Sequence, residues 1–145
     1  MTSSKCISIY TDGSCNVQQK VGGWAIVSVL FSVSGNKKGT TNNEMELYSI
    51  LKAIEYGQMY GYEEIHIYSD SQYAIGSLTE WAYNWEKNGW KKKGGIKNKE
   101  IIKEIFYILK DNPHIHLHKV KAHNGDEMNE RADELARIKC LELVR

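Results

Sequence analysis

The chain has 145 residues, of which 41% are apolar and 26% are charged, and its net charge is +1. This size and composition are typical of one globular domain, over residues 1–145, with a single core, and no apolar run approaches the roughly 20 residues of a membrane span. The first residues lack the apolar stretch of a signal peptide, and three cysteines without paired-ligand spacing indicate free thiols. We therefore expect an intracellular, cytoplasmic protein, with a nuclear or viral context as the alternative.

Three strands are predicted in the first 41 residues. Residues 5–11 alternate in hydrophobicity, as a strand does, and Asp12 follows at the expected strand end, just before Gly13. An aspartate at such a place is also a common turn former, so this position has two interpretations. Residues 23–31 are a second apolar run, and turn formers separate it from a short strand near residues 35–41, expected at or near an edge of the sheet.

The hydrophobic period then changes from two to that of a helix. Asn42 or Asn43 is suited to begin this helix, and Gly57 or Gly61 to end it. The helix is indicated by apolar residues at i, i+3, i+4 and i+7, which are Leu47, Ile50, Leu51 and Ile54.

The remainder of the chain alternates strands with helices. Residues 64–70 return to strand alternation, and a short helix follows with Asp70 or Ser71 at its cap. The remaining predicted elements are a helix that begins near Thr79, a helix over residues 98–109, a strand over residues 114–120 and a last helix from about Glu127 to Leu143.

This order predicts an α/β fold with a five-stranded mixed sheet flanked by helices. Short turns make the first three strands antiparallel, whereas strand–helix–strand connections add the last two in parallel. Ligands of such sheets bind beyond the carboxyl ends of the parallel strands. Asp12 and Asp70 each follow a predicted strand, so we expect both at that edge.

Two further acids are predicted to join them. Glu46 lies in the first turn of its helix near the apolar stripe, and Asp133 flanks the stripe of the last helix. Four gathered carboxylates stay ionised only if cations cancel their charge, and oxygen ligands select Mg²⁺. Two such ions about 4 Å apart suit phosphodiester cleavage. The alternative is that Asp12 is a turn residue and Asp70 a helix cap.

Lysines are concentrated in one stretch of this nearly neutral chain. Between residues 87 and 103 there are seven lysines and one acid, Glu100. Such a surplus indicates a positive lobe that attracts a polyanion, although a solvated loop and helix face is the alternative. Nearby Trp81, Trp85 and Trp90 favour the first interpretation, although the alternative is that these rings are only part of the core. Helical spacing permits that for Trp81 and Trp85, for which we expect partial burial with exposed ring edges.

Five sequence blocks, in this order, resemble the signatures of type 1 ribonucleases H. They are YTDGSC, TTNNEMEL, YSDSQY, TEWAYNWEKNGW and VKAHNGDEMNERADELAR, and they span nearly the whole chain. The resemblance implies a ribonuclease H-like fold and an endonuclease that cuts the RNA strand of RNA–DNA hybrids with two Mg²⁺ ions, for which Mn²⁺ is a possible substitute. Products with a 5′-phosphate and a 3′-hydroxyl, and a monomeric protein without a membrane partner, are part of this expectation.

The resemblance also assigns roles to residues. The metal-binding acids correspond to Asp12, Glu46, Asp70 and Asp133, and His123 corresponds to a mobile histidine that assists water activation or product release. The hybrid-contacting residues fall into three groups, namely Asn16, Asn42, Asn43 and Gln72 toward RNA 2′-hydroxyls, Tyr73, Trp81 and Trp85 toward deoxyribose, and Thr41 and Asn98 toward a DNA phosphate. Residues 81–99 correspond to the family's basic protrusion. The chain departs from the family at Gly39, where an arginine is often found.

Three rival interpretations stay open. His114, His116 and His118 alternate in one strand and offer nitrogen ligands for zinc or iron, or simply mark a less buried sheet face. The domain could bind hybrids without cutting them, or it could be a related nuclease of the same fold, of resolvase or transposase type. All four acids and His123 are present, which favours cleavage.

Overall fold

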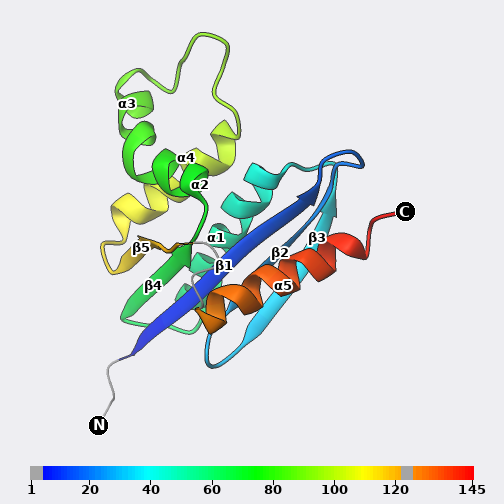
Figure 1. Cartoon of the computed structure of the whole chain (residues 1–145). Coiled ribbons are helices and arrows are strands. Elements are labelled where there is room, and N and C mark those ends of the chain that lie inside the picture. The colour runs from blue at the N-terminus through cyan, green and yellow to red at the C-terminus, as the bar shows by residue number, and fades with distance from the viewer. Residues whose placement is uncertain (1–4, 122–125) are drawn as a thin grey trace.

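The computed structural model describes residues 5–121 and 126–145 and has one five-stranded sheet with the strand order β3-β2-β1-β4-β5. Figure 1 shows helices on both faces of this sheet and a helical lobe above it. The strands are β1 (Cys6–Asn16), β2 (Val21–Val27), β3 (Ser32–Lys38), β4 (Glu64–Ser69) and β5 (Ile115–Lys119). The helical segments are α1 (Asn42–Met59), α2 (Gln72–Gly76), η1 (Ser77–Trp81), α3 (Ala82–Lys87), α4 (Lys99–Asp111) and α5 (Glu127–Leu141).

The sheet is mixed, as predicted. β1 pairs antiparallel with β2 and parallel with β4, β2 pairs antiparallel with β3, and β5 extends the sheet in parallel beyond β4. α1 packs on β1, β2 and β4, whereas α5 crosses β1, β2 and β3 on the opposite face (Figure 1). The central strand is therefore covered on both faces, and the predicted α/β fold is confirmed.

β1 is longer than predicted, so Asp12 does not end its strand. The parallel pairing with β4 stops at Thr11 and Ser69, but the antiparallel pairing with β2 continues to Asn16. Asp12 is therefore the first residue of β1 beyond its parallel partner. The edge of the sheet predicted for ligands is the carboxyl end of β4 and of the parallel part of β1.

The cap of α1 also differs from the prediction. Thr41, with extended backbone, precedes the helix, and its side chain accepts a hydrogen bond from the Glu44 N–H. Asn42 and Asn43 are the first two helical residues. A threonine hydroxyl satisfies one of the free N–H groups of the first turn, and the two amides remain exposed.

The segment from Gln72 to Lys87 is helical throughout, although two separate helices were predicted. A five-residue π-helical turn, η1, joins α2 to α3. Short π-helical turns inside α-helices are common at functional sites. This turn ends at Trp81, so it sets the direction in which the ring leaves the helix.

The core lies between the sheet and α1 and extends under the lobe. Its fully buried side chains are mainly isoleucines from β1, β2, β4, α1 and α4, with Met45 and Leu47. Trp90 belongs to this core, because its indole is 7% exposed and its ring N–H donates to the Tyr107 hydroxyl. No helix in the described part of the chain is long and apolar enough to cross a membrane.

Candidate active site

Three carboxylates converge where the parallel pairing of β1 and β4 ends. One ligand atom from each of Asp12, Glu46 and Asp70 lies within 4.8 Å of the others. Asp12 and Glu46 are 4% and 7% exposed, and Asp70 is half-buried. These residues come from a strand, a helix and a strand–helix connection, so the chain folds three separate acids into one small volume.

Asp133 of α5 is the fourth acid at this place. Its side chain hydrogen-bonds with that of Asp12, and its charge acts on both Asp12 and Glu46. Asp133 lies in the second turn of α5 and is half-buried. The four acids predicted from the sequence are therefore neighbours, with α5 contributing from the opposite face of the sheet to α1.

Burial and mutual repulsion disfavour the ionised forms of these carboxylates. Burial is the largest cause that raises the pKa of Asp12 to about 10, and the charges of Glu46, Asp70 and Asp133 add to it. Burial and the charge of Asp70 raise the pKa of Glu46 to about 8 against the opposing hydrogen bond from Gly13. Groups this costly to ionise together have a physical need for a compensating cation.

The donor set fits hard divalent cations. It consists of carboxylate oxygens only, and the oxygens of Asp12, Glu46 and Asp70 are close enough to share one ion. Mg²⁺ prefers oxygen ligands and keeps several positions for water and substrate phosphate. Asp12, Glu46, Asp70 and Asp133 are therefore the residues that would hold such ions.

The local sequence explains how each acid is positioned. The Gly13 N–H donates to the Glu46 carboxylate at 2.9 Å, which ties α1 to β1. Ser71 caps α2 by accepting from the Ala74 N–H, which leaves Asp70 in the connection between β4 and α2. Asp126 caps α5 and also hydrogen-bonds with Tyr10 of β1, which fixes the end of α5 that carries Asp133.

A groove of about 620 Å³ lies in the lobe. Trp81 is 44% exposed and Trp85 is half-buried, as predicted, and the two rings lie 6.3 Å apart. The Tyr73 ring lies 6.4 Å from that of Trp81, and its hydroxyl accepts a hydrogen bond from the Asn98 side chain. The groove is lined by Tyr73, Trp81, Asn84, Trp85, Lys92, Lys93, Gly94, Gly95, Ile96 and Lys97.

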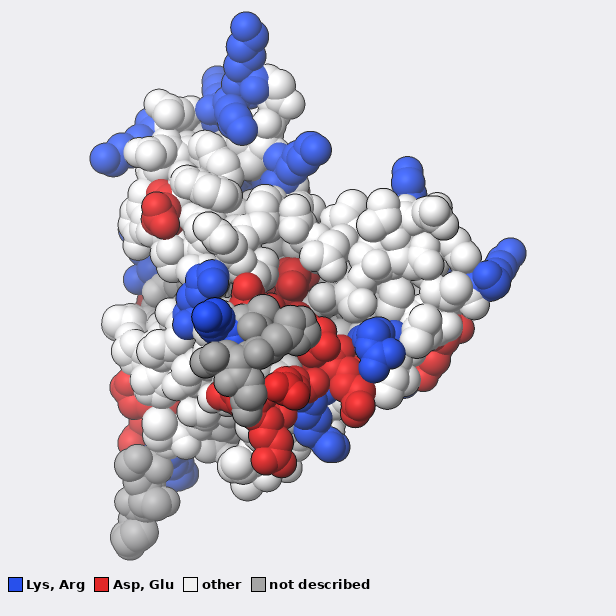
Figure 2. All heavy atoms as spheres, viewed as in Figure 1, with Lys and Arg blue, Asp and Glu red and all other residues white. Residues whose placement is uncertain are grey.

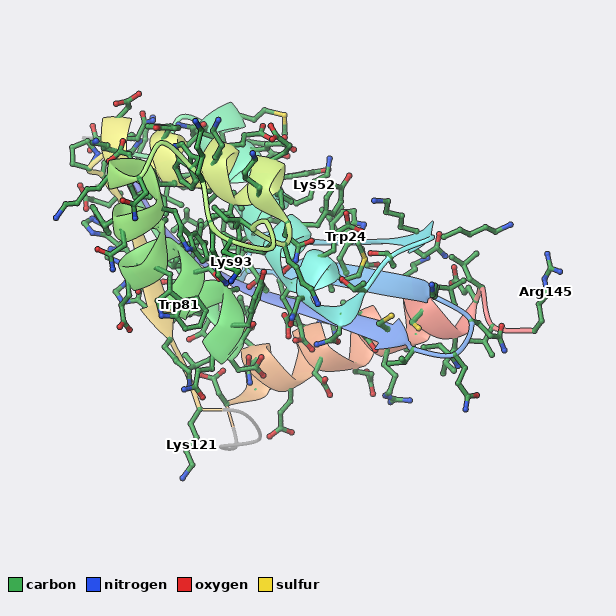
Figure 3. The ribbon with its side chains drawn as sticks, turned by 90° about the horizontal axis from the view of Figure 1, so that it is seen from above. Trp24, Lys52, Trp81, Lys93, Lys121 and Arg145 are labelled. Carbon is green, nitrogen blue, oxygen red and sulfur yellow. The ribbon has the colours of Figure 1, made fainter. Side chains whose placement is uncertain are left out.

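Positive charge gathers on the lobe, away from the acids. Figure 2 shows lysine and arginine side chains projecting from the upper lobe, with a patch of acids below it. Lys93 and Trp81, which both line the groove, lie at the same end of the molecule in Figure 3. The predicted positive lobe is thus present. A polyanion bound to this lobe would be repelled by the carboxylates unless cations screened their charge.

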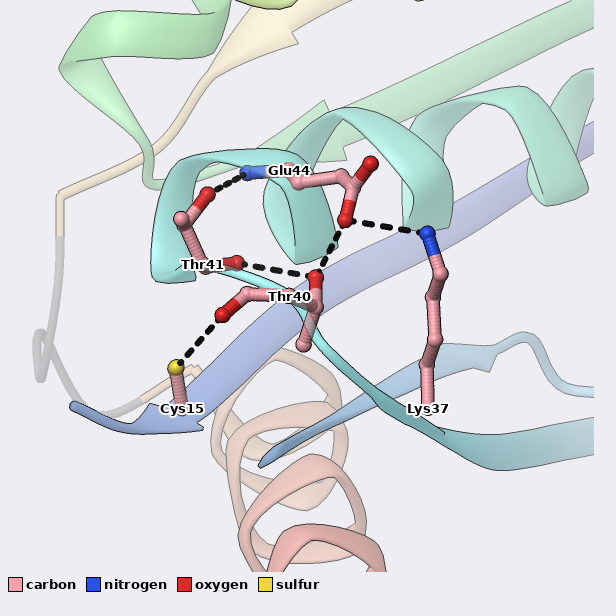
Figure 4. A network of polar contacts seen from close by, with 5 residues as sticks. All are labelled: Cys15, Lys37, Thr40, Thr41 and Glu44. Carbon is pink, nitrogen blue, oxygen red and sulfur yellow. Dashed lines mark hydrogen bonds and ion pairs between the residues drawn. The ribbon is translucent and has the colours of Figure 1, made fainter. Parts of the chain in front are cut away.

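The first turn of α1 presents a polar network beside the site. Thr40 donates to the Glu44 carboxylate, which also pairs with Lys37 at 3.1 Å (Figure 4). Burial opposes ionisation of Glu44, but these two partners outweigh it and lower the pKa of this carboxyl. Gly39 has a φ of 67°, a left-handed conformation that an arginine would adopt only under strain.

The remaining candidate residues are spread over different places. Gln72 is the first residue of α2 and is exposed, whereas Asn98, in the left-handed region, precedes α4. Asn16 ends β1, and its side chain accepts from the Gln19 N–H within the first hairpin. Thr41 and Asn98 thus stand at the starts of two different helices, and His123 lies outside the described residues.

Two features of the site escaped the sequence analysis. Asn84 lines the groove together with Trp81 and Trp85, and its i+3 spacing from Trp81 in a predicted helix would have found it. Asp126, three residues after His123, caps α5 and is bound to Tyr10. An aspartate directly before a helical run is a standard cap signal, but nothing in the sequence links it to Tyr10.

Comparisons with known proteins agree with this geometry. Residues 4–140 match the family model of RNase H. The chain is 39% identical over 140 residues to a ribonuclease H from Syntrophomonas wolfei, covering 92% of this chain and 94% of that protein. It is also 39% identical over 142 residues to a ribonuclease H from Wolbachia, covering 93% and 95%. A solved structure, described as LC9-RNase H1, a type 1 RNase H with the type 2 active-site motif, superposes with a TM-score of 0.81 at 26% identity, covering 99% of this chain and 76% of that one.

Proposed function

The chain belongs to the ribonuclease H family, and from this premise we propose that it is an endonuclease that hydrolyses the RNA strand of RNA–DNA hybrids by two-metal-ion catalysis. The observation that carries the proposal is that one carboxylate oxygen from each of Asp12, Glu46 and Asp70 lies within 4.8 Å of the others, with the Asp133 side chain hydrogen-bonded to that of Asp12. The proposed products carry a 5′-phosphate and a 3′-hydroxyl.

The four acids would hold two Mg²⁺ ions, with Mn²⁺ as a substitute. In this proposal Asp12 would be a ligand of both ions, Asp133 would help to hold one of them, and Glu46 and Asp70 would hold the other. Bound ions of this kind supply Lewis-acid stabilisation of the attacking and leaving oxygens. The contribution of the chain is to hold the carboxylates in place, through the bond from Gly13 to Glu46 and the capped start of α5.

The aromatic groove is the proposed binding place of the DNA strand. Tyr73, Trp81 and Trp85 offer ring faces and edges, which pack against deoxyribose and leave no space for a 2′-hydroxyl. Lys92, Lys93 and Lys97 line the same groove, and their charges attract phosphates irrespective of base sequence. We assign residues 81–99 to a basic protrusion of a single catalytic domain, residues 1–145.

Polar side chains near the acids are the proposed contacts to the RNA strand. Asn42, Asn43 and Gln72 are exposed at the starts of α1 and α2, and amides both donate to and accept from a 2′-hydroxyl. Asn16 is proposed for the same role, and Thr41 and Asn98 are proposed to contact DNA phosphate. His123 is proposed to move a proton at the water or at the leaving product.

The test is a cleavage assay on four labelled substrates, namely RNA–DNA hybrid, duplex RNA, duplex DNA and single-stranded RNA, with Mg²⁺ or with chelator. We expect Mg²⁺-dependent cleavage of the RNA strand of the hybrid alone. Glu46→Gln should abolish it, whereas Glu55→Gln, which changes an exposed acid of the same helix, should retain it. Equal cutting of duplex DNA would assign the chain to a resolvase-type activity, and binding without cutting would make it a non-cleaving hybrid-binding domain. We further propose that the active form is a monomer, which sedimentation of the chain with hybrid would check.

A further inference from the structure

One face of the outer strands β4 and β5 carries a group of histidines that the proposed nuclease chemistry does not use. α5 packs on β1, β2 and β3, and Figure 1 shows it leaving β4 and β5 without a helix on that side. The parallel register places His66 beside His116, and Tyr68 beside His118. Among the described elements, these side chains therefore occupy the open part of the sheet face.

The rings form a continuous stack across three strands. Tyr10 stacks on Tyr68 with centroids 4.6 Å apart, and Tyr68 stacks on His118 at 4.7 Å. His66 then stacks on both His118, at 5.0 Å, and His116, at 4.6 Å. This stack brings three imidazoles together, and its His66–His116 end lies toward the start of β4, whereas Asp70 follows the end of that strand.

Two of these imidazoles lie next to a carboxylate. One ligand atom from each of Glu64, His66 and His116 lies within 4.8 Å of the others. His116 Nε2 is 2.6 Å from a Glu64 carboxylate oxygen, and the two side chains are 39% and 50% exposed. We propose that Glu64, His66 and His116 form a second metal site, which binds one Zn²⁺ ion.

The ligand types separate this site from the carboxylate cluster. Imidazole nitrogen is a ligand for zinc and the later transition metals, whereas Mg²⁺ is held by oxygen. Two histidines and one glutamate leave at least one position of a four-coordinate zinc ion to water. Excess Mg²⁺ therefore occupies the four acids without competing for the histidines.

His118 supplies the hydrogen-bond partner that a zinc-binding histidine usually has on its other ring nitrogen. Its Nε2 lies 2.8 Å from His66 Nδ1. When the His66 Nδ1–H donates to His118, the other nitrogen of His66 carries the lone pair that a metal needs. The stacked rings must tilt for their lone pairs to converge with the Glu64 oxygen, and the exposure of Glu64 and His116 leaves room for that movement.

The sequence alone suggested a different set of ligands. His114, His116 and His118 alternate in the chain, but His114 precedes β5 and is not part of the group that lies within 4.8 Å. His66 comes from β4 and is brought to His116 only by the sheet register. His114 is thus a matched control, since it is a histidine of the same segment outside the proposed site.

The experiment is calorimetric titration of the whole chain with Zn²⁺ in excess Mg²⁺, repeated for His66→Gln, His116→Gln, Glu64→Gln and His114→Gln. We expect one Zn²⁺ per chain, and an affinity that falls by about 10- to 100-fold or more in each of the first three variants. His114→Gln should bind as the original chain does. Zn²⁺ should also raise the melting temperature, because the ion links β4 to β5.

Two results would overturn the proposal. One is the absence of Zn²⁺ binding by the original chain under these conditions, and the other is binding that is equally strong in His66→Gln, His116→Gln and His114→Gln. Circular dichroism and hybrid cleavage in Mg²⁺ verify that each variant is folded. Glu64→Gln changes a half-exposed side chain outside the core, so it keeps the test decisive if a histidine variant fails to fold.

Discussion

The backbone N–H of Gly13 donates a 2.9 Å hydrogen bond to the carboxylate of Glu46, 33 residues further along the chain. Gly13 directly follows Asp12, so the same contact that orients Glu46 also sets the spacing between two of the clustered acids. A carbon atom added at Gly13 would lie 2.5 Å from the Glu46 nitrogen and 2.5 Å from the Met45 carbonyl carbon. The close approach of β1 to α1 therefore requires a residue without a side chain.

Gly13→Ala is expected to destabilise the protein and to impair cleavage. The added carbon meets the backbone of α1, which cannot rotate away as a side chain would, so the free energy of unfolding should fall by about 1–3 kcal/mol or more. Urea unfolding monitored by circular dichroism measures this. Gly61→Ala is the control for cleavage: its φ is 70° and nothing lies within 4 Å of the added carbon, so about 1–2 kcal/mol of backbone strain is expected there without impaired cleavage. Comparable stability of Gly13→Ala and the original chain would contradict the close packing.

Asp12→Asn is expected to abolish turnover while making the metal-free protein more stable at neutral pH. Loss of a shared metal ligand removes several kcal/mol of transition-state stabilisation, which is about a thousandfold or more in rate. The gain in stability follows because Asp12 must take up a proton to fold among Glu46, Asp70 and Asp133 at neutral pH, and asparagine has no such cost. Hybrid binding should persist, as a filter or mobility-shift assay would check.

The pH dependence of that gain has a definite sign. Burial and neighbouring charges raise the pKa of Asp12 from 3.8 in the unfolded chain to about 10 in the folded one. Between these values the folded state holds a proton that the unfolded state has lost, so the stability of the original chain in chelator falls as pH rises. The difference in unfolding free energy between Asp12→Asn and the original chain should grow from pH about 4 to pH about 8. A constant difference, or a collapse of folding in Asp12→Asn, would restore the interpretation of Asp12 as a structural turn residue.

Mg²⁺ is expected to stabilise the folded chain. A ligand that binds only the folded state adds about 2.7 kcal/mol at one hundred times its dissociation constant. Thermal melts over a Mg²⁺ series should therefore show a rising midpoint, with a smaller rise in Asp12→Asn. KCl at matched ionic strength is the control for screening of the clustered charges. Equal effects of KCl and MgCl₂ would mean that screening, and not binding, accounts for the rise.

Sequence patterns predicted the placement of the acids better than the boundaries of the elements that carry them. Asp12 was expected at a strand end, and it lies instead inside β1, one residue beyond the parallel pairing with β4. The expectation of convergence held because the carboxyl end of a parallel pair, and not the end of the strand, defines the edge where ligands bind. Alternation in one strand cannot reveal where a neighbouring strand stops.

Contacts that depend on strand register or on the packing of a helix on the sheet could not be predicted from the sequence. The approach of His66 to His116 requires the pairing of β4 with β5, and the bond between Tyr10 and Asp126 requires the packing of α5 on β1. The cap of α1 was missed for a local reason, since Thr41, Asn42 and Asn43 are all acceptable caps. The extended backbone of Thr41, with φ −125° and ψ 164°, and the hydrogen bond that its side chain accepts from the Glu44 N–H distinguish it as the cap.

Thr41→Ala is expected to cost about 1 kcal/mol of stability, because the Glu44 N–H would lose its side-chain partner at the start of α1. Thr41→Ser keeps the hydroxyl and should retain most of that stability. Urea unfolding separates the two variants. If both variants fold well, the Michaelis constant for hybrid tests a second role of the hydroxyl. A constant that rises in Thr41→Ala and returns to the original value in Thr41→Ser would mean that the hydroxyl contacts the substrate as well as capping the helix. Equal stability of Thr41→Ala and the original chain would contradict the cap.

Replacement of Lys92, Lys93 and Lys97 by glutamine is expected to weaken hybrid binding and to reduce its salt dependence. These lysines line the aromatic groove, and each phosphate that they no longer neutralise should lower the slope of log affinity against log salt by about 0.7–0.9. The turnover number at saturating substrate should change little, because the lysines are not part of the carboxylate cluster. Binding titrations and cleavage kinetics over a series of KCl concentrations measure both quantities.

The matched control removes the same amount of charge elsewhere. Lys52, Lys110 and Lys139 pair with Glu55, Glu86 and Glu142, so their positive charges are already offset locally. Their triple replacement by glutamine gives the same change in net charge but should leave the salt slope nearly unchanged. An equal reduction of the slope in both triple variants would mean that the total charge attracts the hybrid. A reduction confined to the groove variant would locate the attraction in the basic protrusion, because only charges within about 10 Å of a phosphate act on it at moderate salt.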